Sequence, residues 1–221
     1  MDAGASLETE VGVYRAAALA MASNPRAGLL ERKRLRESGR LEEVRLKDAE
    51  VVRYLLGRGA DVNAQSSKNG DTALVAACRY GDRPTVLLLL EARADPNLMQ
   101  TGLNFGETAF LTAARWGNAD LLADLAAAGA DVNATNYSSY LERVGSAAMW
   151  RAMYKQKAHL ALLHRLGCDL SYANEGGVSA ATLAADDGFP ESLRFLLEEV
   201  RVPDRKGRLR KELQRLDAAE S

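Results

Sequence analysis

The sequence predicts an all-α solenoid, a stack of small helical units, and two observations lead to this prediction. A five-residue phrase recurs four times, and its aspartates are spaced 34, 36 and 38 residues apart; the four copies are residues 59–63, 93–97, 129–133 and 167–171. A leucine-rich stretch precedes each copy. A repeat period in this range is typical of stacked supersecondary units, and such stacks present long concave surfaces that usually bind other proteins.

Each predicted unit begins with a short inner helix and continues with an outer helix. Thr72 and Thr108 stand 36 residues apart ahead of helical stretches, where a hydroxyl oxygen can accept an unpaired backbone N–H, so we expect both to be N-caps. Gly81, Gly117 and Gly188 stand where one helix must stop and the next begin, a place that favours positive φ. The outer helices are indicated by apolar residues at helical spacing, such as Val86, Leu89 and Leu90.

The order of these features resembles the ankyrin repeat, with its threonine box, its central glycine turn and its Gly-Ala-Asp-Val-Asn hairpin. The resemblance covers roughly residues 38–200 and implies about five helix-turn-helix repeats with hairpin fingers, including degenerate end caps. The family's box proline is replaced throughout, by Ala73, Ala109, Ala148 and Ala180. Proline is favourable in the first helical turn, so we expect an array of modest stability.

Three regions follow from this pattern. Residues 1–37 are expected to form an N-terminal extension, helical in part, and residues 38–200 the repeat array. The repeats fall at about 38–65, 66–101, 102–137, 138–172 and 173–200. In the fifth repeat the match runs to Val200 and then leaves the pattern. Residues 201–221 are expected to form a basic C-terminal helix or tail.

Composition and motifs argue against several classes of protein. The formal net charge of -1 gives no reason to expect nucleic acid as the main partner, and no apolar run is long enough to span a bilayer. Without a convincing signal peptide, an intracellular location in cytoplasm or nucleus is expected. Nucleophile elbows, phosphate-binding loops and zinc-protease motifs are absent from the sequence, so we expect no enzyme activity and no cofactor.

The cysteines and histidines are too few and too dispersed to suggest a metal site. Cys78 and Cys168 occupy positions where the family has a small buried alanine, two repeats apart, which is beyond the reach of a disulfide. We expect both to be free, buried thiols. His159 and His164 have poor spacing for a shared metal and are expected at the surface.

The resemblance also indicates which side chains would contact a partner. In the family these are the residues beside the box glycine, the two before the central glycine and the finger tips. Two central fingers are longer than the family needs, and the longer one has a Tyr/Ser composition typical of binding loops. Arg, Tyr and Trp are also frequent at interface hot spots. The predicted partner-binding residues are Arg79, Tyr80, Phe105, Arg115, Trp116, Tyr137, Tyr140 and Tyr154.

A simpler interpretation of these side chains is also open. Phe105 and some of the tyrosines would then pack the fingers together, and Trp116 would cover a neighbouring helix. The prediction remains a monomeric, non-catalytic interaction module or adaptor that binds a protein or peptide.

The ends of the chain suggest an alternative function. Residues 32–40 and 205–216 are rich in Lys and Arg, and Leu209, Leu213 and Leu216 form an apolar stripe in the C-terminal segment. This segment is expected to cap the last repeat, to dock on a larger complex, or to address the chain to nucleic acid or acidic membrane. In the last case the protein would be a targeting or regulatory subunit, with the array as scaffold.

Overall fold

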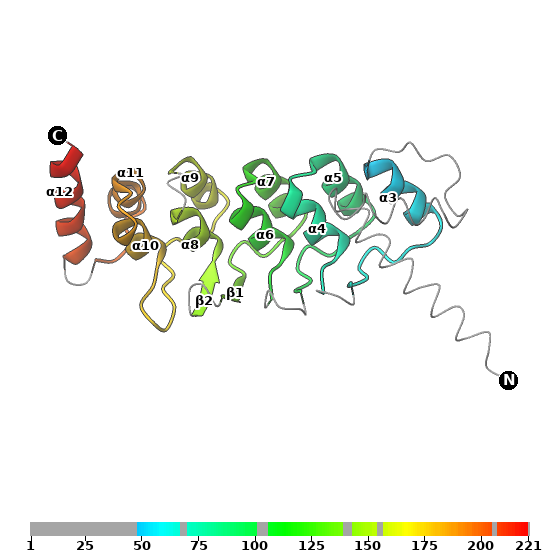
Figure 1. Cartoon of the computed structure of the whole chain (residues 1–221), viewed down its shortest axis with the longest axis horizontal. Helices are drawn as coiled ribbons and strands as arrows, with labels where there is room; N and C mark the ends of the chain where they lie inside the picture. Colours follow the sequence, from blue (N-terminus) through cyan, green and yellow to red (C-terminus); the bar gives the residue numbers. More distant parts are fainter. Residues whose placement is uncertain are drawn as a thin grey trace. The chain divides into compact units, whose positions relative to one another are not determined.

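The structure, a computed structural model, describes residues 48–66, 70–100, 106–138, 143–153, 157–204 and 207–220 (Figure 1). The predicted N-terminal extension and the charged inner helix expected at residues 41–46 lie outside this range. The chain forms two compact units, residues 1–112 and 113–221. Apart from one two-stranded hairpin, the regular structure of the described residues is helical, which confirms the all-α prediction.

Unit 1 contains three helices and the start of a fourth. They are α3 (Asp48–Gly57), α4 (Ala73–Tyr80), α5 (Arg83–Glu91) and the first half of α6 (Ala109–Trp116). The inner helix α4 packs on the outer helix α5, which in turn packs on α3. Thr72 and Thr108 are N-caps as predicted, because their hydroxyl oxygens accept the backbone N–H groups of Val75 and Leu111 at 3.2 and 3.3 Å.

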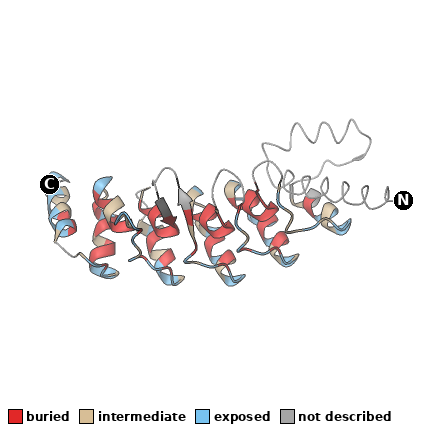
Figure 2. Ribbon diagram, turned by 90° about the horizontal axis from the view of Figure 1, so that it is seen from below, coloured by how far each residue is buried: buried red, intermediate tan, exposed pale blue. Residues whose placement is uncertain are grey.

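Unit 2 continues the same arrangement from the end of α6. Its elements are α7 (Ala119–Ala127), β1 (Thr135–Ser138), β2 (Arg143–Ser146), α8 (Ala147–Ala152), α9 (Lys157–Arg165), α10 (Ala180–Asp186), α11 (Pro190–Arg194), the π-helical turn η1 (Phe195–Glu199) and α12 (Arg208–Glu220). Inner helix α8 packs on inner helix α10, and outer helix α9 packs on both α7 and α11. Figure 2 shows the buried residues on the helix surfaces that face one another within this layered arrangement.

Left-handed residues end the helices in phase with the repeat. Gly81, Gly117 and Gly188 have φ values of 71°, 81° and 71°, which confirms the predicted stops of the inner helices. The outer helices stop at Gly59, Gly129 and Gly167 in the same conformation. In the second repeat Arg93 takes this place with φ 64°, although an L side chain rarely adopts it.

The aspartate of each recurring phrase shapes its finger. Its carboxylate accepts the backbone N–H two residues later, at 2.8 to 3.0 Å in the four copies, which closes an Asx turn. Neighbouring fingers are then linked by the asparagine of the phrase. The side-chain carbonyl of Asn63 accepts the N–H of Asp95 at 2.8 Å, and that of Asn133 accepts the N–H of Asp169 at 2.7 Å. These links explain why the phrase recurs at the repeat period.

The fifth repeat carries one extra residue, and η1 absorbs it. From the central glycine to the left-handed stop there are 12 positions between Gly81 and Arg93, and 13 between Gly188 and Arg201. The hydrogen bond that closes each of the first four outer helices spans five residues, whereas Val202 donates to Leu196, six residues back. A π turn is the usual way for a helix to hold an insertion. The repeat pattern therefore extends to Arg201, one residue past the Val200 where the sequence comparison lost it.

The C-terminal segment forms helix α12, which packs on α10 and α11. Leu209 and Leu213 of the predicted apolar stripe are buried, and Leu216 lies close to Gly188. Arg194 of α11 pairs with Asp217 at 2.6 Å, and Arg208 pairs with Asp186 at 3.2 Å. Helix α12 therefore covers the last repeat with its apolar side.

Candidate partner-binding surface

The eight predicted contact residues are described to different degrees. Arg79 and Tyr80 end α4 in unit 1, and Arg115 and Trp116 end α6 in unit 2. Tyr137 is placed only as part of strand β1. Phe105, Tyr140 and Tyr154 lie outside the described residues.

Arg79 is held by contacts within unit 1. Its guanidinium donates two hydrogen bonds to the carboxylate of Asp71, at 2.6 and 2.9 Å, and the arginine side chain is only 14% exposed. This bidentate bond raises the pKa of Arg79 above its already high ordinary value, so the charge is permanent. The neighbouring Tyr80 is 37% exposed. At the end of α4, the tyrosine is therefore the more accessible of the predicted pair.

The same carboxylate holds the base of the next finger. The side-chain amide of Gln100 donates to Asp71, and the backbone N–H of Gln100 donates to the carbonyl of Glu107 at 3.1 Å. Glu107 is itself buried and accepts the hydroxyl of Thr112 at 3.2 Å. Buried polar groups connected in this way fix local geometry, because breaking one bond leaves a partner unsatisfied. Asp71 thus ties the finger base to the end of α4, beside Tyr80.

Arg115 lies over the ring of Trp150 in the next inner helix. Its guanidinium carbon is 4.8 Å from the ring centroid, a cation–π contact. Trp150 and Met149 are buried, and Met153, Tyr172 and Leu183 pack against them. The ring of Trp150 thus supports Arg115 from within the core of unit 2.

Trp116 is the most exposed large apolar side chain among the described residues, at 55%. The backbone beneath it is held firmly, because the carbonyl of the preceding Arg115 accepts a hydrogen bond from Arg151 at 2.9 Å. Gly117 then ends the helix, and its N–H bonds back to Ala114. An exposed indole on a fixed backbone is the arrangement expected of an interface hot spot, since little order is lost on binding.

Arg151 is a functional neighbour that the sequence analysis missed. It is 2% exposed, and besides Arg115 its guanidinium contacts the Nδ1 atom of His159 at 3.2 Å. Burial lowers the pKa of His159, and the charge of Arg151 lowers it further, so this histidine is neutral and accepts at Nδ1. The expectation of two surface histidines is therefore right for His164, which is exposed, and wrong for His159, which is half-buried.

The enlarged finger of unit 2 is a β-hairpin. Strands β1 and β2 pair antiparallel, with Asn136 opposite Gly145 and Tyr137 opposite Val144. The side chain of Asn136 is buried. Ser146 ends β2 and also caps α8, because its hydroxyl accepts the N–H of Met149 at 3.4 Å. The finger is thereby joined rigidly to the inner helix that carries Trp150.

The described residues offer no alternative chemical site of the kinds considered. They hold no group of His, Cys, Asp and Glu suited to a metal ion. Cys78 and Cys168 are free and buried, as predicted. Burial raises the pKa of both thiols, to about 12 for Cys168, which disfavours the reactive thiolate. In this part of the chain, no helix has the length and apolar character that crossing a membrane requires.

Comparison with protein families identifies the repeats. A family model of ankyrin repeats, in three copies, matches residues 43–136. This confirms the resemblance for the first three repeats, and the helix pairs α8–α9 and α10–α11 continue the pattern beyond the matched region.

Similar curated proteins carry the same repeats. The chain is 33% identical over 165 residues to an ankyrin repeat domain-containing protein, SAT10, of Stachybotrys chartarum, covering 73% of this chain and 8% of that protein. It is 45% identical over 74 residues to the ankyrin repeat and KH domain-containing protein mask-1 of Caenorhabditis elegans, covering 33% and 3%. Over 72 residues it is 35% identical to the neurogenic locus notch homolog protein 1 of Xenopus laevis, again 33% and 3%. The chain spans less than a tenth of each relative.

Proposed function

Because this chain is an ankyrin repeat protein, we propose that it acts as a non-catalytic adaptor that binds a protein or peptide partner through its inner-helix ends and central fingers. Ankyrin repeats are generally protein–protein interaction modules. The proposal includes a monomeric protein that works in the cytoplasm or nucleus.

The observation that carries the proposal is the exposure of Trp116 on a locked support. The indole is 55% exposed, while Arg115, Trp150 and Arg151 fix the backbone and the surface around it. A tryptophan that served only to cover a neighbouring helix would be buried. Large aromatic side chains on preorganised surfaces contribute most to binding in protein interfaces.

The alternative, targeting through basic segments, has less support at the C-terminal end. In α12, Arg208 pairs with Asp186 and Arg215 pairs with Glu212 at 2.6 Å. These acidic partners reduce the positive potential that nucleic acid or acidic lipid would need. A steep salt dependence of binding to DNA, RNA or anionic vesicles would favour this alternative over the adaptor.

The adaptor proposal is tested by capture of partners from lysate with the wild type and with the double variant Trp116→Ala, Tyr140→Ala. We expect the double variant to lose the captured protein while its thermal midpoint stays close to that of the wild type. Leu87→Ala is the matched control, because Leu87 is an exposed apolar residue, at 38%, on the outer helix α5. Equal losses in both variants, or unfolding of the double variant, would contradict the proposal.

A further inference from the structure

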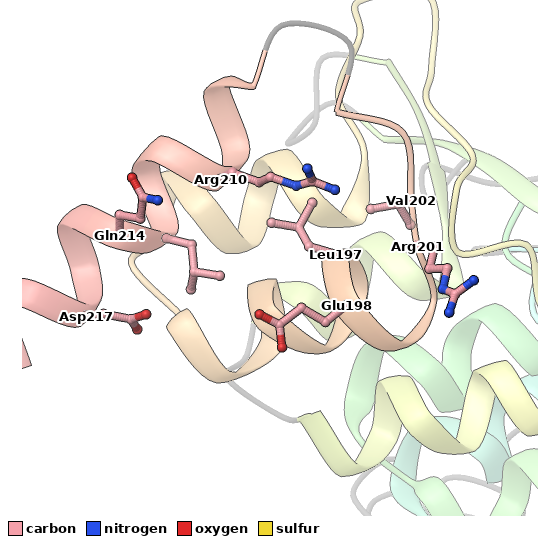
Figure 3. Close-up of a pocket in the computed structure, with 8 residues that line it drawn as sticks. Leu197, Glu198, Arg201, Val202, Arg210, Gln214 and Asp217 are labelled. Carbon is pink, nitrogen blue, oxygen red and sulfur yellow. The ribbon is translucent and has the colours of Figure 1, made fainter.

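An open groove lies at the C-terminal end of unit 2, between the end of the last repeat and α12 (Figure 3). Its volume is about 620 Å³, which is within the usual size of ligand sites. Leu197 of η1, Val202 of the connection and Leu213 of α12 line its apolar part. The groove is built from other elements than those that support Trp116.

The extra residue of the fifth repeat forms one wall of this groove. Leu197 and Glu198 belong to the π turn that absorbs the insertion, and Arg201 follows with a left-handed φ of 61°. In three of the other repeats a glycine takes the position of Arg201, which is the residue that adopts this conformation without strain. The chain therefore places a charged side chain at a backbone position that would be more stable with glycine.

Two arginines at the groove are not neutralised within the described residues. Arg194, Arg208 and Arg215 of the surrounding helices each pair with a carboxylate, at 2.6 to 3.2 Å. Arg201 and Arg210, which line the groove, form no ion pair with any residue that the structure describes. In Figure 3, Arg210 extends past Leu197 toward Val202, and Arg201 lies on the same side of the groove.

The opposite side of the groove is acidic. Figure 3 shows the carboxylates of Glu198 and Asp217 there, away from the two arginines. Asp217 is already paired with Arg194, so Glu198 supplies the uncompensated negative charge on this side. A ligand that is acidic along its whole length would be attracted at one end and repelled at the other.

We propose that this groove binds a short acidic segment of a partner protein, in one direction only. Two neighbouring carboxylates of the segment pair with Arg201 and Arg210, since the guanidinium fork matches carboxylate geometry. An apolar side chain next to them enters between Leu197 and Leu213, and the uncharged remainder passes Glu198. The site is separate from the surface around Trp116, so it gives the adaptor a second contact.

The test uses fluorescein-labelled heptapeptides on the full chain, with binding measured by fluorescence anisotropy. Each probe carries two adjacent glutamates at one end and a central leucine, with the other positions varied in a small library. Matched probes replace both glutamates with glutamine, add glutamates at the far end, or carry phosphoserine in their place.

The decisive variants are Arg201→Gly and Arg210→Gln. Glycine at position 201 removes the guanidinium and also relieves the left-handed strain, so its thermal midpoint should equal or exceed that of the wild type. Loss of binding in this variant therefore cannot come from unfolding. Lys211→Gln is the matched control, because Lys211 is an exposed cation beside Arg210 that does not line the groove.

We expect each arginine variant to weaken binding about tenfold, as for the loss of a charge-assisted hydrogen bond. Lys211→Gln and Trp116→Ala should leave it within about twofold, the scale of a screened surface charge. The glutamine probe should not bind, and the probe acidic at both ends should bind more weakly. The proposal is overturned if no acidic probe binds, if Arg201→Gly binds like the wild type, if Lys211→Gln loses as much, or if only phosphoserine probes bind.

Discussion

At the scale of single residues, Arg151 and Gly117 form a contact that neither could keep alone. A β-carbon added at Gly117 would lie 3.1 Å from Nη1 of Arg151, and Gly117 also has a left-handed φ of 81°. The guanidinium is held in place by its bond to the Arg115 carbonyl and cannot easily move aside. Glycine is thus required there by backbone conformation and by space.

Alanine at position 117 should therefore cost more stability than alanine at a glycine that is only left-handed. Gly129 is the matched control, because it has φ 87° but nothing within 4 Å of an added β-carbon. We expect Gly129→Ala to lower the free energy of unfolding by about 1–2 kcal/mol. Gly117→Ala should lower it by about 1 kcal/mol more, because the guanidinium must shift. Urea unfolding measures both, and equal losses would contradict the contact.

His159 gives unit 2 a dependence on pH. Burial and the charge of Arg151 lower its pKa in the folded state, and Asp120 opposes this shift only in part. The folded protein then binds fewer protons than the unfolded chain, so stability is full above the unfolded pKa of about 6.5 and falls as pH drops below it. We expect His159→Gln to flatten this fall between roughly pH 7 and 5. The exposed His164→Gln should leave the profile unchanged, and an unchanged profile in His159→Gln would contradict the assignment.

At the scale of elements, local capping explains where the inner helices begin. Ser179 caps α10 and exchanges hydrogen bonds with Thr182, so that each side chain accepts the other residue's backbone N–H. Helix α8 is capped by Ser146, one position before the residue that occupies the threonine place of the repeat. The loss of the box proline is thus accompanied by intact side-chain caps.

Helix α12 depends on its apolar contacts more than on its exposed ion pairs. Leu213 is buried, whereas Lys211 is exposed on the same helix. Leu213→Gln should lower the free energy of unfolding by about 1–3 kcal/mol and speed hydrogen exchange in α12, because surface ion pairs contribute less than about 1 kcal/mol each. Lys211→Gln should change neither quantity. If exchange in α12 stayed as slow in Leu213→Gln, the leucine contacts would not hold the helix.

At the scale of the molecule, the sequence predicted the repeats because their signals are local. Threonine caps, left-handed glycines and Asx turns each depend on residues within a few positions, and all recur in phase. The π turn also had a signal, the 13 positions between Gly188 and Arg201, but no glycine marks its end.

The contacts around the candidate site were less predictable, because they join residues from different helices. Arg79 was predicted from its position to face a partner, yet Asp71 holds its guanidinium within the unit. The role of Arg151 depends on Arg115, 36 residues away, and on the burial of Trp150. Whether the predicted side chains bind a partner stays a prediction that the variants at Trp116 and Tyr140 decide.

The two cysteines of the chain lie in different units, Cys78 in unit 1 and Cys168 in unit 2. Because both thiols are buried and have raised pKa values, a disulfide reagent should modify each only when its own unit opens. Labelling followed by peptide mass analysis should therefore report two separate opening rates, and rapid labelling of either thiol in native buffer would contradict its burial. The wild-type protein thus contains one chemical reporter for each half, so the order in which the halves open can be timed without adding a probe.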